Sequence, residues 1–337
     1  MCTAITLRSE ERENFFGRTM DFSYEIEPYL YVVPRDYIWT DVRNINYYNS
    51  YSFIAIGQES GDELAFFDGV NEKGFAAAAL YFAGYADFHE YSNENKMDYR
   101  NHNKKNLIVA YDFVQYILGR CSTVEELIEE LQHINIIGVS DDVTRSVAPL
   151  HWIATDRSGK CVVIEQTSDG LHAFYNPIGV LANSPDFIWH MTNLRNYMSV
   201  SPVQKERSIW GSIELEPFGQ GAGTSQLPGG YTSPERFVRA AFHKTHVSTP
   251  KSCGEAVITC FHIMESVSIP KGIVITSKDT YDYTKYTAFM NTNTCEYYFR
   301  SYENSEITKV CLWNYYDTID RPINLGNIRR PISFPAL

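Results

Sequence analysis

The order of predicted elements indicates an α+β fold, in which antiparallel sheets are covered by helices. Strand-like segments come first, followed by two helices, further strands, two more helices and a last group of strands. This order differs from the regular strand–helix alternation that builds a parallel sheet. The 24 tyrosines agree with a sheet-rich fold, because tyrosine favours half-buried strand surfaces. No repeat, low-complexity segment or flexible linker divides residues 1–337, so we expect a single domain.

The first part of the chain has the composition of strands joined by short turns. Residues 2–7 and 15–22 form a predicted hairpin around the polar segment 8–14. Because hairpin strands are antiparallel, Cys2 would lie beside the far end of the second strand, near Asp21. Further strands are predicted at residues 30–33, 52–56, 63–70 and 74–82.

Two pairs of helices interrupt the strands. Apolar residues recur at helical spacing over residues 107–118, and Ser122 or Thr123 can cap a second helix over 123–131. Pro234 marks the first turn of a helix that ends near residue 246, and another helix follows at 254–267. Residues 186–210 show no clear period. The remaining predicted strands are 150–156, 161–166, 284–291, 296–302 and 307–312.

Charge and composition exclude several classes of function. The net charge of −12 argues against nucleic acid and anionic membrane surfaces as partners. No apolar run approaches the roughly 18 residues of a membrane span, and the N-terminus lacks the pattern of a signal peptide. We therefore expect a cytoplasmic protein whose seven cysteines are mostly small buried hydrophobes. His243 and His246 have no third ligand nearby in the sequence, so we expect no metal site.

Cys2 is the first candidate for chemistry. Removal of Met1 is favoured by the small residue that follows it, and would leave Cys2 with a thiol and a free α-amine. An α-amine has a pKa of about 8, so it can act as the general base for its own thiol. The same residue type at this position can also be an ordinary buried cysteine, so Cys2 alone is weak evidence.

Two charged residues on the second strand strengthen this hypothesis. Arg18 would favour the thiolate of Cys2, and Asp21 could hold the α-amine by a hydrogen bond. Strand alternation places Arg18 and Asp21 on opposite faces, so both reach Cys2 only if the strand is bulged or ends near Met20. The competing interpretation is an ordinary surface ion pair.

Ordered sequence blocks along nearly the whole chain resemble the choloylglycine hydrolase family, which contains conjugated bile salt hydrolases and penicillin V acylases. The first blocks are Met-Cys-Thr at the start and Gly-Arg-Thr-Met-Asp at residues 17–21. The others are at residues 69–74, 176–185, 189–194, 227–239 and 269–272.

The resemblance implies a four-layer αββα fold of the N-terminal nucleophile hydrolases, and hydrolysis of a non-peptide amide through a thioester on Cys2. It further implies that Arg18 and Asp21 flank the nucleophile and that Arg236 is a second active-site arginine. The Asn183 amide and a backbone N–H near Tyr81 would form the oxyanion hole. No cofactor or metal is expected. Family members are commonly homotetramers, and the segment 189–210 resembles one used in their assembly.

Tyr81 bears on the substrate. Bile salt hydrolases of this type usually have asparagine at this position, whereas penicillin V acylases resemble this sequence in having tyrosine. An aromatic ring can stack on a phenoxyacetyl group and narrow a sterol pocket. Met20 and Phe22, on either side of Asp21, are further expected substrate contacts. We therefore predict penicillin V acylase-like activity ahead of bile salt hydrolysis. An N-acyl-homoserine lactone acylase is a further alternative. So is an inactive relative that binds acyl compounds, although the intact set of Cys2, Arg18, Asp21, Asn183 and Arg236 speaks against it.

Overall fold

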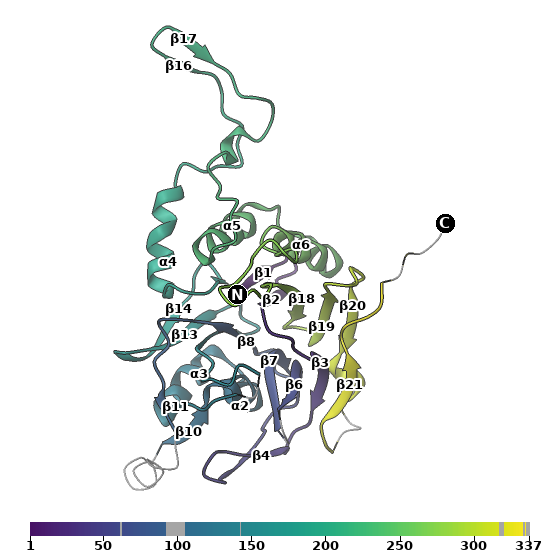
Figure 1. Ribbon diagram of the computed structural model, residues 1–337. Helices are drawn as coiled ribbons and strands as arrows, with labels where there is room; N and C mark the ends of the chain where they lie inside the picture. The colour runs from purple at the N-terminus through teal and green to yellow at the C-terminus, as the bar shows by residue number, and fades with distance from the viewer. Residues whose placement is uncertain (61–62, 92–104, 142, 317–319, 333, 335–337) are drawn as a thin grey trace.

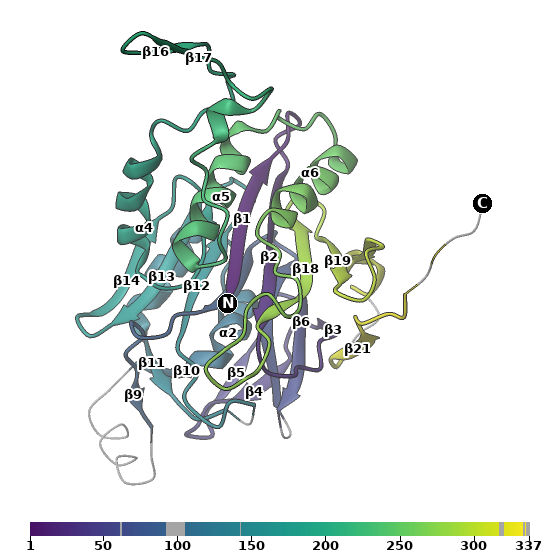
Figure 2. The same ribbon diagram turned by 45° about the horizontal axis from the view of Figure 1, so that its top comes forward.

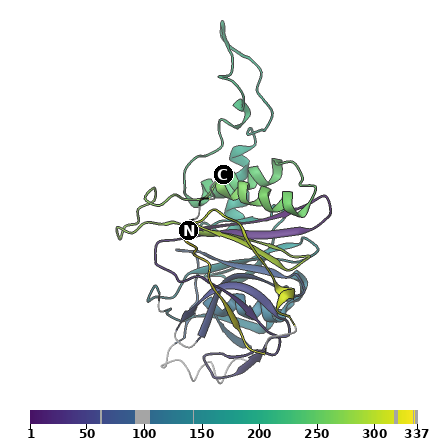
Figure 3. The same cartoon turned by 90° about the vertical axis from the view of Figure 1, so that its right-hand side faces the viewer.

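Two large antiparallel sheets face each other and carry helices on their outer sides. The computed structural model describes residues 1–60, 63–91, 105–141, 143–316, 320–332 and 334. Viewed along the layers, helices, sheet, sheet and helices follow one another (Figure 3). This arrangement confirms the predicted four-layer αββα fold.

The first sheet contains the two N-terminal strands at its centre. Among the described residues, its strand order is β15-β1-β2-β18-β19-β20. The predicted hairpin is confirmed, because Cys2 on β1 pairs with Met20 on β2. The bounds are β1 (Cys2–Arg8), β2 (Asn14–Phe22), β15 (Val180–Leu181), β18 (Tyr283–Asn291), β19 (Glu296–Ser301) and β20 (Thr308–Cys311).

The second sheet packs its apolar face against the first. Its order over the described residues is β14-β13-β12-β8-β7-β6-β3-β21. Side chains of β1, β2, β7, β8 and β18 meet between the sheets in one continuous apolar core. The bounds are β3 (Tyr29–Val33), β6 (Phe53–Ser60), β7 (Glu63–Asn71), β8 (Ala76–Tyr81), β12 (Leu150–Thr155), β13 (Cys161–Thr167), β14 (Gly170–Tyr175) and β21 (Ile323–Asn327).

Helices cover the outer face of each sheet (Figure 2). The first sheet carries α5 (Ser233–His246) and α6 (Cys253–Glu265), and the second carries α2 (Phe113–Arg120) and α3 (Val124–Glu130). A capping box of Thr232 and Glu235 begins α5, which satisfies free backbone N–H groups of its first turn. The predicted cap of α3 is Thr123, whose side chain accepts from the Glu126 backbone N–H.

The helix predicted over residues 107–118 is wrong in its first half. Residues 106–109 form strand β10 (Asn106–Val109), then the 3₁₀ turn η1 (Ala110–Asp112) leads into α2. The run Leu-Ile-Val pairs in parallel with β11 (Ile134–Gly138), which in turn pairs with β9 (His89–Glu90). This pairing outweighs a helical spacing that short apolar runs also satisfy.

The segment predicted to be irregular at residues 186–210 contains helix α4 (Phe187–Asn193), capped by Asp186. A hairpin of β16 (Ser208–Trp210) and β17 (Ile213–Leu215) then projects from the body of the molecule (Figure 1). The remaining elements are β4 (Ile38–Thr40), β5 (Asn46–Tyr48), η2 (Leu131–His133), η3 (Leu194–Tyr197), η4 (Ala222–Thr224) and η5 (Leu312–Asn314). Within the described ranges, no helix is long and apolar enough to cross a membrane.

Candidate active site

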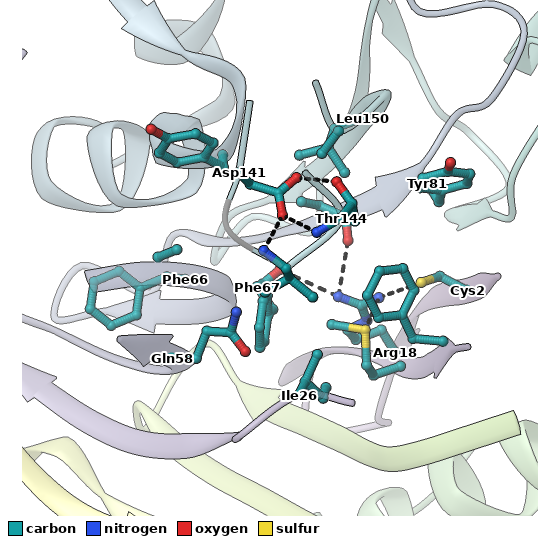
Figure 4. A pocket seen from close by; sticks show the side chains of 17 residues that line it. Cys2, Arg18, Ile26, Gln58, Phe66, Phe67, Tyr81, Asp141, Thr144 and Leu150 are labelled. Carbon is teal, nitrogen blue, oxygen red and sulfur yellow. Dashed lines mark hydrogen bonds between the residues drawn. The ribbon is translucent and has the colours of Figure 1, made fainter. Parts of the chain in front are cut away.

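The thiol of Cys2 lies between the two sheets and contacts a buried arginine. Cys2 begins β1, and its side chain faces the second sheet together with Met20 and Arg18 of the neighbouring strand. Arg18 donates from Nη2 to the Cys2 sulfur at 2.6 Å, and from Nη1 to the Ala79 carbonyl at 2.9 Å. Figure 4 shows the guanidinium pointing toward the sulfur. The predicted contact between Arg18 and Cys2 is therefore present.

Asp21 occupies the opposite face of β2, as strict alternation requires. The strand continues to Phe22 and its pairing with β1 has no bulge, so neither condition for Asp21 and Arg18 to reach Cys2 together is met. The Asp21 carboxylate instead accepts from the Thr284 hydroxyl at 2.6 Å and lies 3.8 Å from Arg236. Its backbone carbonyl accepts from the Met1 nitrogen at 2.6 Å. The same carbonyl lies 3.9 Å from the Cys2 sulfur, so Asp21 approaches both Met1 and Cys2 through its backbone and not through its carboxylate.

Arg236 and Asn183 hold the backbone of Cys2. The Cys2 N–H donates to Asn183 Oδ1 at 2.7 Å, and Arg236 Nη2 donates to the same oxygen at 2.6 Å. Arg236 Nη1 donates to the Cys2 carbonyl at 2.6 Å. These donors fix the orientation of the Asn183 amide, whose Nδ2 donates to the Tyr81 carbonyl at 2.7 Å. Strands β1 and β8, helix α5 and the segment after β15 therefore meet at Cys2.

Burial sets the electrostatics of these charged groups. Desolvation raises the pKa of Asp21, and the Arg236 charge and the Thr284 hydrogen bond oppose that rise. Desolvation lowers the pKa of Arg236, which Asp21 partly offsets. Burial alone would also lower the pKa of Arg18, but the neighbouring Cys2, Tyr286 and Asp68 raise it, so Arg18 stays charged beside the sulfur.

An apolar pocket opens onto the Cys2 sulfur. It encloses about 890 Å³, its mouth included. Met20, Phe22 and Tyr81, the predicted substrate contacts, all line it with Cys2 and Arg18. Asp21, Asn183 and Arg236 lie outside this lining and contact the Cys2 segment instead. The other lining residues are Ile26, Gln58, Ala65, Phe66, Phe67, Ala79, Tyr111, Asp141, Val143, Thr144, Ala148 and Leu150 (Figure 4).

Two buried histidines support the Asn183 backbone, and neither was predicted from the sequence. His190 Nε2 lies 2.7 Å from the Asn183 carbonyl, and His151 Nε2 lies 3.0 Å from the Ala182 carbonyl. Ser233, in the first turn of α5, accepts from the Asn183 N–H at 2.8 Å. Burial lowers the pKa of His190 to about 4, so its ring is neutral near pH 7. His190 lies in the family-like block at residues 189–194, which was the available signal.

Comparison with known proteins agrees with this geometry. Residues 2–320 match the model of the linear amide C–N hydrolases, choloylglycine hydrolase family. A bile salt hydrolase/transferase of Lactiplantibacillus plantarum is 33% identical over 93% of this chain and 92% of its own length. A penicillin V acylase of Pectobacterium atrosepticum is 26% identical, over 85% and 73%. The solved C2A mutant of the conjugated bile acid hydrolase from Clostridium perfringens has a TM-score of 0.90 and 29% identity, covering all of both chains.

Proposed function

We propose that this protein, which belongs to the choloylglycine hydrolase family of linear amide C–N hydrolases, cleaves conjugated bile salts with Cys2 as the nucleophile. The observation that carries the role of Cys2 is the Arg18 guanidinium, which lies 2.6 Å from the sulfur at an apolar pocket. A positive charge in a buried site stabilises a thiolate, the nucleophilic form of cysteine.

The reaction proceeds in two halves. The Cys2 sulfur attacks the amide carbonyl carbon while the α-amine, freed by removal of Met1, takes the thiol proton. Asn183 Nδ2 has two hydrogens and gives one to the Tyr81 carbonyl, so the other can stabilise the oxyanion. The α-amine then protonates the leaving amine, and a thioester remains on Cys2. Water, deprotonated by the same α-amine, releases the acid and restores the thiol.

Asp21 and Arg236 are proposed to position Cys2. In the structure the Cys2 nitrogen is still in a peptide bond with Met1 and donates to Asn183 Oδ1. After Met1 is removed, the same contact would hold the α-amine beside the sulfur. Arg236 fixes the Cys2 carbonyl, and Asp21 lies 3.8 Å from that arginine within the same buried layer.

Our proposal places bile salts ahead of penicillin V as the substrate. The prediction from Tyr81 placed penicillin V acylase first, but the bile salt hydrolase relative is more similar and is covered more fully than the acylase relative. The pocket lining is also dominated by aliphatic and aromatic side chains, which suit an extended apolar acyl group.

Hydrolysis of penicillin V is the second candidate, and Tyr81 is the observation that favours it. This half-buried ring lines the pocket beside Cys2. Figure 4 shows it on the Cys2 side of the pocket, across from Phe66. A phenoxyacetyl group bound at Cys2 could stack on it.

A side-by-side assay tests the proposal. Glycocholate, taurocholate and penicillin V are incubated with the wild-type protein and with Cys2→Ser, and intact mass establishes that Met1 is absent from both. We expect turnover of the two bile salts to exceed that of penicillin V, and Cys2→Ser to lose all three activities. Hydrolysis that persists in Cys2→Ser would overturn the role of Cys2, and turnover of penicillin V alone would overturn the choice of substrate.

We also propose that four copies assemble through the projecting segment 198–218. It exposes large apolar side chains, among them Trp210 at 73% and Phe218, which is fully exposed. Monomeric soluble proteins rarely expose so many large apolar side chains to water on one projecting segment. This segment overlaps and extends beyond residues 189–210, which the family resemblance associates with assembly.

A further inference from the structure

A buried carboxylate lies next to the Arg18 guanidinium and belongs to none of the family-like sequence blocks. Asp68 lies on β7, and its Oδ2 is 3.7 Å from Arg18 Nη1. Tyr286 on β18 donates to Oδ2 at 2.6 Å, and Tyr297 on β19 donates to Oδ1. Arg18, Asp68, Tyr286 and Tyr297 are all completely buried. The chain Cys2–Arg18–Asp68–tyrosines thus crosses the interface between the sheets.

A contribution to fold stability alone does not explain this buried cluster of polar side chains. A buried ion pair often contributes little to stability, and apolar side chains of similar volume commonly replace it without loss. The surrounding interface consists of apolar residues of the main core. Tyr286 and Tyr297 nevertheless bind Asp68, which lies next to the Arg18 guanidinium that contacts the sulfur. The arrangement therefore suggests a role in the chemistry of Cys2.

The geometry of the guanidinium shows how Asp68 is kept at a distance. At 3.7 Å, the Asp68 carboxylate is too far from Arg18 for a good hydrogen bond. The Tyr286 hydroxyl, in contrast, lies within normal hydrogen-bond range of Asp68 Oδ2. The two hydroxyls satisfy one oxygen each, which lets Arg18 Nη1 bind the Ala79 carbonyl. Nη2 then remains free to donate to the Cys2 sulfur.

We propose that Asp68, Tyr286 and Tyr297 form a positioning unit that sets how strongly Arg18 acts on the Cys2 sulfur. The tyrosines hold the carboxylate, so that it orients Arg18 without drawing Nη2 away from the sulfur. The inference rests on the proposed role of Cys2 as nucleophile. It assigns to three residues behind Arg18 control over the fraction of thiolate at a given pH.

The two kinds of substitution have opposite expected effects. Tyr286→Phe or Tyr297→Phe leaves a carboxylate oxygen unsatisfied, so Asp68 should draw Arg18 toward itself and away from the sulfur. Asp68→Asn removes the negative charge that competes with the sulfur for Arg18. The tyrosine variants should therefore need higher pH to form the thiolate, and the Asp68 variant should need lower pH.

The test measures alkylation of Cys2 by iodoacetamide as a function of pH, followed by mass spectrometry of the N-terminal peptide. Peptide resolution is needed because Cys253 and Cys311 are partly exposed and can be alkylated as well. We expect the midpoint to rise by about half a pH unit or more in each tyrosine variant, which is about threefold slower alkylation at neutral pH. In the hydrolysis assay, kcat should fall more than KM rises.

Tyr298→Phe is the matched control. It lies on the same strand as Tyr297, and its hydroxyl donates to Glu296, outside the cluster. The positioning role is overturned if the pH profiles of Tyr286→Phe and Tyr297→Phe both coincide with those of wild type and Tyr298→Phe. It is also overturned if the alkylation midpoints of these two variants fall. Either result decides the question even if Asp68→Asn does not fold. In that case the role of Cys2 still stands if alkylation at Cys2 abolishes hydrolysis. Full activity after complete Cys2 alkylation would instead overturn the proposed function itself.

Discussion

At the residue scale, β2 presents one charged group to each side of the sheet. Arg18 points between the sheets and contacts the Cys2 sulfur, while Asp21 points toward the helices and lies near Arg236. Arg236 in turn donates to the Cys2 carbonyl. The side chain and the backbone of Cys2 are therefore held from opposite faces, by groups that a single strand face could not supply.

Replacement of Tyr81 tests which acyl group the pocket accepts. Tyr81→Asn removes an aromatic ring from the pocket wall, which should widen the site for a sterol and remove a stacking surface. We expect the ratio of kcat/KM for glycocholate to that for penicillin V to rise about tenfold, within the range of one pocket contact. Tyr85→Asn, at a residue outside the pocket lining, should leave the ratio unchanged. An unchanged ratio in Tyr81→Asn would contradict a role in selection.

The buried His190 should make the fold sensitive to acid. Its pKa of about 4 lies below the ordinary 6.5 because burial disfavours the charged ring. Between these two pKa values the folded state binds fewer protons than the unfolded state. The contribution of His190 to the free energy of unfolding is therefore fully present above pH 6.5 and is lost as the pH falls toward 4. The loss from this residue should be on the order of 3 kcal/mol at the lower end.

Chemical denaturation at pH 7 and pH 4.5 measures that loss. His190→Gln removes the titrating ring and keeps a donor, so the variant should be less stable at pH 7 but lose less stability on acidification. His246→Gln, at an exposed residue of α5, serves as the control and should behave like wild type. The prediction is wrong if wild type and His190→Gln lose equal stability between the two pH values.

At the scale of elements, the turn between β7 and β8 is fixed by contact with the other sheet. Gly74 has φ +80°, and a Cβ there would lie 1.9 Å from the Thr292 carbonyl oxygen, which follows β18. The turn therefore carries both a backbone conformation that favours glycine and a close approach to the first sheet. This close approach places the turn after β7 directly against the residue that follows β18.

Gly74→Ala should destabilise the protein by about 2–4 kcal/mol, since both strain and a backbone clash contribute. Gly84→Ala separates the two causes, because Gly84 has φ +79° and nothing within 4 Å of its added Cβ. We expect this control to cost about 1 kcal/mol. Free energies of unfolding from denaturant titration give both values, and equal losses would refute the contribution of the Thr292 contact.

The error at residues 107–118 has its cause at the same scale. The local spacing of apolar residues fits a helix, but residues 107–109 pair with β11, which begins 25 positions later in the chain. The cap of α3 was more predictable, since Thr123 acts within one turn of its own helix. Local devices are visible in a sequence window, whereas partners of short strands are not.

At the scale of the whole molecule, the two sheets share one apolar core, while the prediction of a single domain over residues 1–337 stays a prediction. The projecting hairpin of β16 and β17 lies far from β1 and the N-terminus (Figure 1). Its exposed apolar groups and the active site can therefore be altered separately.

If the hairpin mediates assembly, substitutions in it should change the oligomeric state without touching the active site. Trp210→Glu with Phe218→Glu places two charges on the proposed contact, which should convert tetramers into smaller species in light scattering after gel filtration. Ile258→Glu, at an exposed apolar residue of α6, should leave the assembly unchanged. A double variant that stays tetrameric would rule out this contact, and a wild-type monomer would rule out the assembly itself.

The α+β class, the β1–β2 hairpin and the residues expected around Cys2 could be predicted from the amino-acid sequence, because these depend on local patterns and on blocks of adjacent residues. Tertiary structure decided that Arg18 and Asp21 act from opposite faces, that His190 and His151 hold the Asn183 segment, and that Asp68 lies behind Arg18. Asp68 and Tyr297 are 229 positions apart. Their contact depends on how two sheets pack, which no pattern along either strand specifies.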